Sequence, residues 1–235
     1  MIILSLDSSS KNLSVAINNN NMVLCEISCN SNLKHSEIII STIKSALRYS
    51  NLKIKDIDVF AVTNGPGSFT GIRTGLSIIK SMSFSTNKQI FVVSSLEALA
   101  YNLLNVLENI TICSCISLNN NKVYSSTFKI ISNEVVRVSN DKEISNENLI
   151  SELSKFDEQI YLVGEDSEKI FGMSNLNNLI LVSENLRYLK SSLLSYKFAR
   201  NKENNKILVK AENLNPNYLS ICQAEKVYIS SRENR

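Results

Sequence analysis

The feature that most constrains the fold of this sequence is a cluster of glycines in the first third of the chain. Six glycines occur in 235 residues, and four of them are Gly65, Gly67, Gly71 and Gly75. An apolar run from Asp58 to Thr63 precedes the cluster. Glycine permits positive φ, proline fixes φ in a turn, and serine is a good helix N-cap. The stretch therefore predicts a buried strand, a sharp turn and a helix that opens near the following serine.

The turn has two interpretations that the residues alone leave open. A strand, a glycine turn and a helix N-terminus can present free N–H groups to an anion, which makes Gly65, Gly67 and Ser68 candidates for phosphate binding. The alternative is a tight connection that binds nothing. Asp7 and Ser8 close the first apolar run of the chain and complete the candidate cofactor-binding set. Here the alternative is hydrogen bonding between these side chains and the neighbouring turn.

Two of the clustered glycines lie inside the expected helix. Gly71 and Gly75 are four residues apart and so share one helical face. Each glycine costs about 1 kcal/mol against alanine, which implies a packing reason. A face without side chains lets another backbone approach closely. That backbone belongs either to a partner chain or to the chain's own sheet, and we retain both interpretations.

Composition narrows the class of protein. The chain is 43% apolar with a net charge of +3, and no basic run is interleaved with aromatic residues. It can therefore build a core, and it is a poor candidate for tight nucleic-acid binding by itself. No apolar run has the length of a membrane span, so we expect a cytoplasmic protein with no membrane contact. The odd number of cysteines, five, predicts free thiols, and Cys113 and Cys115 fit a buried strand better than half a metal site.

The order of apolar runs predicts an α/β fold in two lobes. Residues 1–108 read as β-β-β-α-β-α-β-α, a mixed sheet with a leading hairpin, and residues 109–235 read as a second unit. A helix is expected over His35–Tyr49. His35 is the only histidine, which leaves no histidine cluster for a metal, so a structural or partner-contact role is expected for it.

Three stretches together resemble one protein family. They are ILSLDSS from Ile3, NGPGSFTGIRTG from Asn64 and VSSLEALA from Val93. In this order and spacing they resemble the TsaB family, the dimerisation subunits of the bacterial machinery that makes threonylcarbamoyladenosine in tRNA. The resemblance covers about the first 100 residues well and the rest loosely.

The resemblance implies a fold and a set of partners. The fold is the two-lobed one of actin, Hsp70 and the sugar kinases. The partners are a catalytic paralogue of the TsaD type, which modifies adenosine 37 of tRNA, and a small TsaE-type ATPase. ATP and Mg²⁺ would belong to those other subunits, tRNA would be reached only through the complex, and the isolated chain would form a homodimer. The expected partner interface lies on the first-lobe helices and comprises His35, Ile38, Ile39, Thr42, Gly71, Arg73, Gly75 and Ile79.

The resemblance also implies that this chain has no catalytic and no metal-binding residues. The catalytic paralogue carries a His-x-x-x-His metal pair where this sequence has Ser95 and Leu99. Serine is a weak metal ligand and leucine is none. Residues 113–119, where a second phosphate loop would open, contain no glycine. The Asp-Ala-Arg run usual in TsaB relatives is also missing ahead of Val123, so cleft contacts of that motif are not carried over.

We therefore favour a non-catalytic scaffold that binds a TsaD-like protein. The alternative is a small ATP-binding enzyme that uses Asp7 and the Gly65–Gly67 loop. A metallopeptidase is a remote third option because the chain has one histidine.

Overall fold

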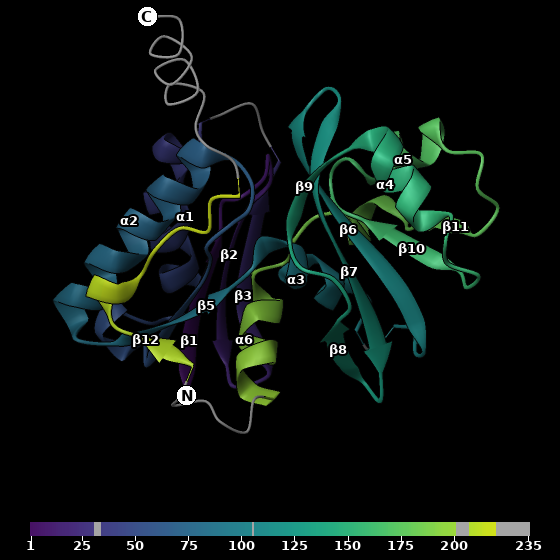
Figure 1. The fold of residues 1–235 in the computed structure, drawn as a ribbon. Coiled ribbons are helices and arrows are strands. Elements are labelled where there is room, and N and C mark those ends of the chain that lie inside the picture. Colours follow the sequence, from purple (N-terminus) through teal and green to yellow (C-terminus); the bar gives the residue numbers. More distant parts are fainter. Residues whose placement is uncertain (31–33, 105, 201–206, 220–235) are drawn as a thin grey trace, which may run out of the picture.

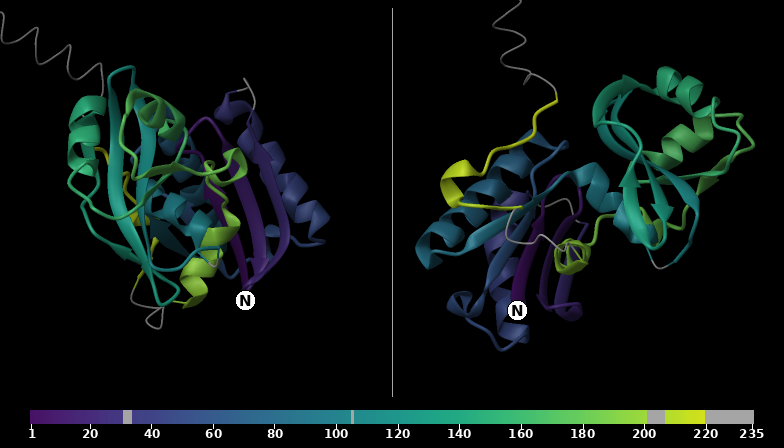
Figure 2. Two further views of the ribbon diagram at one scale, coloured as in Figure 1. Left: turned by 90° about the vertical axis from the view of Figure 1, so that its right-hand side faces the viewer. Right: turned by 60° about the horizontal axis from the view of Figure 1, so that its bottom comes forward.

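Two α/β lobes lie side by side in the computed structural model, which describes residues 1–30, 34–104, 106–200 and 207–219 (Figures 1 and 2). The first sheet has the strand order β12-β5-β4-β1-β2-β3. Its strands are β1 (Ile2–Asp7), β2 (Leu13–Asn19), β3 (Met22–Cys29), β4 (Val59–Thr63), β5 (Gln89–Val93) and β12 (Leu208–Val209). The first three pair antiparallel as a meander, whereas β1, β4 and β5 run parallel.

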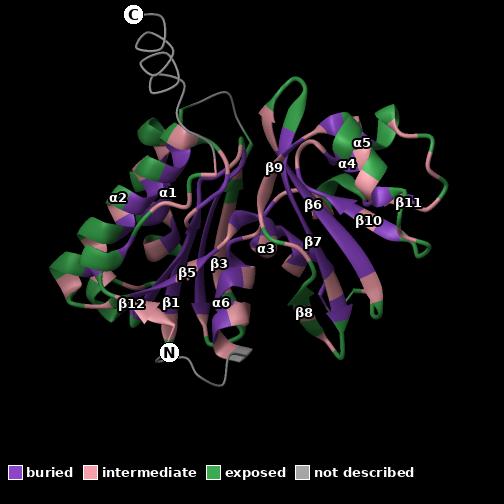
Figure 3. Ribbon diagram, in the orientation of Figure 1, coloured by how far each residue is buried: buried purple, intermediate pink, exposed green. Residues whose placement is uncertain are grey.

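Helices cover both faces of this sheet, which is why β4 is buried along its whole length. On one face lie α1 (His35–Tyr49) and α2 (Phe69–Thr86), packed side by side. The opposite face, which looks toward the second lobe, carries α3 (Ser95–Ala100) and α6 (Ser192–Arg200). Figure 3 shows α1 and α2 exposed along their outer sides and buried where they meet the sheet.

The second lobe is built on a sheet in the order β11-β10-β6-β7-β8, with β9 paired to β7. Its strands are β6 (Ile110–Asn119), β7 (Lys122–Ile131), β8 (Glu134–Arg137), β9 (Lys142–Ser145), β10 (Ile160–Val163) and β11 (Leu179–Leu181). Its helices are α4 (Asn146–Leu153) and α5 (Ser167–Met173). Short 3₁₀ turns complete the chain at Ile54–Asp56, Tyr101–Leu103, Glu184–Leu186 and Ala211–Asn213. One hydrophobic core joins the lobes, since Ile3 and Ala61 of the first sheet belong to the same cluster as Ile112 and Phe128 of the second.

The expected second lobe of residues 109–235 is wrong at its C-terminal end. From Ser192 the chain returns to the first lobe, where α6 packs on β1 and β2, and β12 pairs with β5. The carboxylate of Glu26 on β3 caps the N-terminus of α6. It accepts hydrogen bonds from the backbone N–H of Ser192 at 3.0 Å and from the Ser192 hydroxyl at 2.9 Å. The second lobe is therefore a contiguous insertion between two parts of the first. The predicted boundary at residue 235 lies outside the described residues.

Candidate functional site

The glycine cluster forms the predicted strand, turn and helix. Strand β4 ends at Thr63, a turn with a cis Gly65–Pro66 bond follows, and α2 begins at Phe69. Ser68 caps the helix, as its hydroxyl accepts a hydrogen bond from the Gly71 N–H at 3.2 Å. The first element of the candidate site is thus set by local sequence.

Asp7 is fully buried at the end of β1 and ties the turn to the neighbouring strand. Its Oδ1 atom accepts hydrogen bonds from the hydroxyls of Thr63 at 2.5 Å and Ser9 at 2.7 Å, and from the Ser9 N–H at 3.2 Å. Its Oδ2 atom has no partner among the described residues. Burial raises the pKa of Asp7 above its ordinary value, although the hydrogen bonds from Thr63 and Ser9 act in the opposite direction.

The glycine turn packs directly against the residues that follow Asp7. The Ser68 N–H donates to the Ser9 carbonyl at 2.7 Å. A Cβ placed on Gly67 would lie 2.1 Å from that carbonyl oxygen, and one on Gly71 would lie 2.1 Å from the Ser8 carbonyl oxygen. The N–H groups of Ser68 and Gly71 are therefore used inside the subunit. Of the two interpretations of the turn, this geometry supports close packing.

The expected partner-facing role of Gly71 and Gly75 is wrong. Both are buried, and a Cβ on Gly75 would lie 2.2 Å from the hydroxyl oxygen of Ser8. That hydroxyl donates to the Gly71 carbonyl at 2.9 Å. The bare helical face thus receives the turn after β1. Gly65 also packs internally, since its Cβ position lies 2.8 Å from the Asn217 carbonyl oxygen.

Three other residues of the expected interface are also buried within the subunit. Ile39 and Ile79 are 0% exposed and Thr42 is 7% exposed, because all three point from the helices into the first lobe. Their predicted contact with a partner is wrong for the same reason as for the glycines. His35 and Ile38 are half-buried and Arg73 is exposed, so these three do reach the surface.

Large apolar side chains that the sequence reasoning missed lie exposed on the same helices. Ile40 and Tyr49 on α1 are 49% and 66% exposed, and Phe84 on α2 is 81% exposed. The signal for Phe84 was available, because the buried positions Ile72, Ile79 and Ser83 define one side of α2 and Phe84 falls outside it.

A cavity of about 470 Å³ opens between the lobes at the N-termini of α1 and α2. Glu165 reaches it from the second lobe, and its carboxylate accepts hydrogen bonds from the backbone N–H groups of Lys11 and Ser117, each at 3.3 Å. Burial raises the pKa of Glu165. On the first-lobe side, Nε2 of His35 lies 3.1 Å from the Lys11 carbonyl, which can only accept, so this nitrogen carries the proton. Sequence reasoning did not single out Glu165 or Lys11.

The two positions that correspond to metal-binding histidines lie in the interior. Ser95 and Leu99 on α3 are 0% and 4% exposed, and Leu99 belongs to the core shared by the lobes. Within the described ranges, no three His, Cys, Asp or Glu side chains are grouped to hold a metal ion. Cys113 and Cys115 are buried free thiols on β6, as the sequence predicts, and Cys222 lies outside the described residues.

These two lobes, with their mixed sheets flanked by helices, define a two-lobed α/β protein. The YeaZ structure from Pseudomonas aeruginosa matches 93% of this chain and 99% of its own, with a TM-score of 0.79 at 19% identity. The family model for the tRNA N6-adenosine threonylcarbamoyltransferase TsaD matches residues 29–224. The chain therefore belongs to this family, and within it the chain is TsaB-like.

Curated relatives match it over very different lengths. The TsaB protein of Bacillus subtilis is 26% identical over 167 residues, 71% of this chain and 72% of that protein. A Buchnera aphidicola TsaB from Schizaphis graminum is 37% identical over 99 residues, 42% of this chain and 47% of its own length. The threonylcarbamoyltransferase of Kosmotoga olearia is 46% identical over only 63 residues, 27% of this chain and 19% of that enzyme. This chain thus spans about half of that Buchnera protein and about a fifth of the enzyme. None of the helices in the described ranges is long and apolar enough to cross a membrane.

Proposed function

We propose that this chain is a non-catalytic subunit of the cytoplasmic machinery that places threonylcarbamoyl on adenosine 37 of tRNA, and that it acts by binding a TsaD-like catalytic protein. The observation that carries the proposal is that large apolar side chains are exposed on both helices, Ile40 and Tyr49 on α1 and Phe84 on α2. Large exposed apolar side chains on adjacent helices are typical of a protein–protein interface.

A non-catalytic role is supported by the interior of the molecule. Where the resemblance places metal-binding histidines in the catalytic paralogue, this chain has Ser95 and Leu99. Leu99 packs in the core and offers no ligand atom. The side chains at these two positions therefore do not form a metal site like the histidine pair of the paralogue. In this proposal the partner carries out the reaction.

We also propose that the chain alone binds no nucleotide, so that ATP and Mg²⁺ belong to other subunits. In the cavity between the lobes, the Glu165 carboxylate accepts hydrogen bonds from the backbone N–H groups of Lys11 and Ser117. Those are the donors that a phosphate would need there, and a carboxylate beside them repels an anion. The unpartnered Oδ2 of Asp7 is the one observation that favours the alternative, an ATP-binding enzyme using Asp7 and the Gly65–Gly67 loop. Calorimetry showing micromolar ATP binding by the isolated chain would establish that alternative.

Three further partner assignments follow from the proposal. A TsaE-like ATPase would join the same complex, tRNA would be bound only by the assembled complex, and the isolated chain would pair with a second copy. The small net charge of +3 supports the indirect route to tRNA, because tight nucleic-acid binding relies on many cationic contacts.

The experiment is co-purification with a TsaD-like protein followed by a tRNA modification assay with and without this chain. In the double variant Ile40→Ser/Phe84→Ser, we expect loss of TsaD binding and of the stimulated modification. Val136→Ser is the matched control, because Val136 is 44% exposed on β8 of the second lobe. Equal binding by the double variant and the wild type would show that the interface lies elsewhere.

A further inference from the structure

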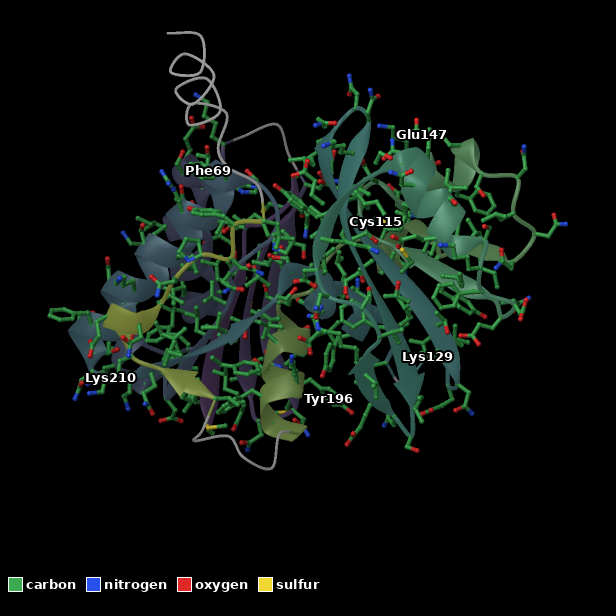
Figure 4. All side chains as sticks on the ribbon, in the orientation of Figure 1. Phe69, Cys115, Lys129, Glu147, Tyr196 and Lys210 are labelled. Atoms are coloured by element: carbon green, nitrogen blue, oxygen red, sulfur yellow. The ribbon has the colours of Figure 1, made fainter. Side chains whose placement is uncertain are left out.

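One charged side chain on the outer surface of α2 is held rigidly although it is exposed. The guanidinium carbon of Arg73 lies 3.8 Å from the ring centroid of Phe69 and 5.5 Å from that of Tyr218. The two rings stack on each other with centroids 4.8 Å apart and planes inclined by 28°. Arg73 Nε also donates a hydrogen bond of 2.7 Å to the Tyr218 hydroxyl. Figure 4 marks Phe69 at the start of α2, where the last described residues of the chain pass. We call Phe69, Arg73 and Tyr218 the Arg73 cluster.

The cluster leaves most of the donors of Arg73 unused. Only Nε has a hydrogen-bond partner, and no acidic side chain pairs with Arg73, among the residues that the structure describes. Guanidinium carries five N–H donors, and the four on Nη1 and Nη2 form a fork that matches the two oxygens of a carboxylate. Because the stacking already fixes the side chain, a ligand would not have to order it on binding.

The surroundings favour an acidic group on a protein over a phosphate of RNA. Helix α2 carries two cations, Arg73 and Lys80, and no acidic residue. Phe84 follows Arg73 by 11 residues, about three helical turns, so both lie on one side of the helix. An exposed phenylalanine suits the apolar part of a protein interface, whereas RNA binding relies on a larger array of cations.

We propose that the Arg73 cluster is a preformed receptor for an aspartate or glutamate side chain of the protein partner that docks on α1 and α2. Arg73 binds the carboxylate through Nη1 and Nη2, and Tyr218 is a positioning residue that holds Nε and the ring stack in place. This inference rests on the proposed function, since it names a contact within that interface. It makes Tyr218 part of the docking surface.

The test is calorimetric binding of the TsaD-like partner at low and high salt. Arg73→Gln should weaken Kd by about 30-fold or more and flatten its salt dependence, because one member of a desolvated charge pair is lost. Arg73→Lys should weaken binding almost as much, since lysine lacks the fork. Tyr218→Phe, which keeps the ring and removes the hydroxyl, should weaken binding by about 3- to 10-fold. Lys80→Gln is the control, with an expected change below about 3-fold. All variants should melt like the wild type to within a few degrees.

Each other outcome overturns the inference in a recognisable way. If the wild type does not bind the partner, the proposed function fails and this contact fails with it. If Arg73→Gln binds as the wild type does while Ile40→Ser/Phe84→Ser does not, the function stands and the receptor is refuted. A lower melting temperature with unchanged Kd would show that the cluster only stabilises the packing of Tyr218 on α2 and binds no partner. Loss of self-association alone would identify a second copy as the occupant, and loss of tRNA binding alone would identify an RNA phosphate.

Discussion

The close contact between α2 and the turn after β1 can be tested by adding single methyl groups. In Gly75→Ala the new Cβ would lie 2.2 Å from the Ser8 hydroxyl oxygen, so that Ser8 must rotate. Rotation gives up the hydrogen bond from Ser8 to Gly71, worth about 1 kcal/mol, and overpacking adds about 1–3 kcal/mol. The better helix propensity of alanine returns about 1 kcal/mol. We expect a net loss of about 1–3 kcal/mol in the free energy of unfolding.

A second substitution separates side-chain from backbone collisions. Ser8→Ala removes the hydroxyl and leaves the Ser8 Cβ 3.5 Å from the new methyl group, an ordinary contact. The double variant Ser8→Ala/Gly75→Ala should therefore recover stability, with a coupling energy of about 1–3 kcal/mol. Gly71→Ala should not be rescued by Ser8→Ala, because its Cβ meets the Ser8 backbone oxygen at 2.1 Å.

The assay is chemical or thermal unfolding of the wild type and of these three single and two double variants, where 1 kcal/mol corresponds to about 2–4 °C for a chain of this size. Gly172→Ala on α5 is the control, because nothing lies within 4 Å of its Cβ position. It should stabilise the protein by about 0.5–1 kcal/mol through helix propensity. Gly71→Ala as stable as Gly172→Ala, or equal rescue of both α2 variants by Ser8→Ala, would refute the packing argument.

Three other substitutions test the polar contacts. The raised pKa of Asp7 means that the native state binds the proton of Asp7 more tightly than the unfolded state does, so the contribution of Asp7 to stability falls as pH rises from about 3.8 through the folded pKa. In thermal melts, the melting temperature of Asp7→Asn should therefore rise relative to that of the wild type as pH increases above about 4, and a difference that stays constant with pH would contradict this sign. Glu165→Ala should give the cleft measurable affinity for pyrophosphate by calorimetry, which the wild type lacks, because the N–H groups of Lys11 and Ser117 become free. Glu26→Ala should lower the free energy of unfolding by about 1–2 kcal/mol, because α6 loses its capping carboxylate, and hydrogen exchange should show faster opening of α6 than of α4.

Local elements could be predicted from the sequence, whereas contacts between distant segments could not. The strand, turn and helix around Pro66 follow from residues that are neighbours in the chain. The four-residue spacing of Gly71 and Gly75 places them on one face, but it does not say what that face meets. The answer, Ser8, comes from more than 60 residues earlier. For this reason the sequence alone could not place Gly71 and Gly75 inside the subunit.

The same limit explains the C-terminal error and the missed cluster. Strand β12 has two residues, too few to show a periodicity, and its position is set by pairing with β5. Glu26 caps α6 across 166 residues, and Tyr218 meets Arg73 across 145. Such pairings have no signature in a single sequence. They form only in the folded protein, where residues after the second lobe pack against the first lobe.

The discontinuous first lobe has a consequence for synthesis on the ribosome. Residues 110–181 of the second lobe emerge as one contiguous stretch and can pair their strands as soon as they leave the exit tunnel. The first lobe has to wait, because α6, β12 and Tyr218 are translated after the whole insertion. A nascent chain stalled before Ser192 would therefore expose the face of β1, β2 and β4 that α6 later covers and the edge of β5 that β12 later pairs with, and would be a natural client for a chaperone.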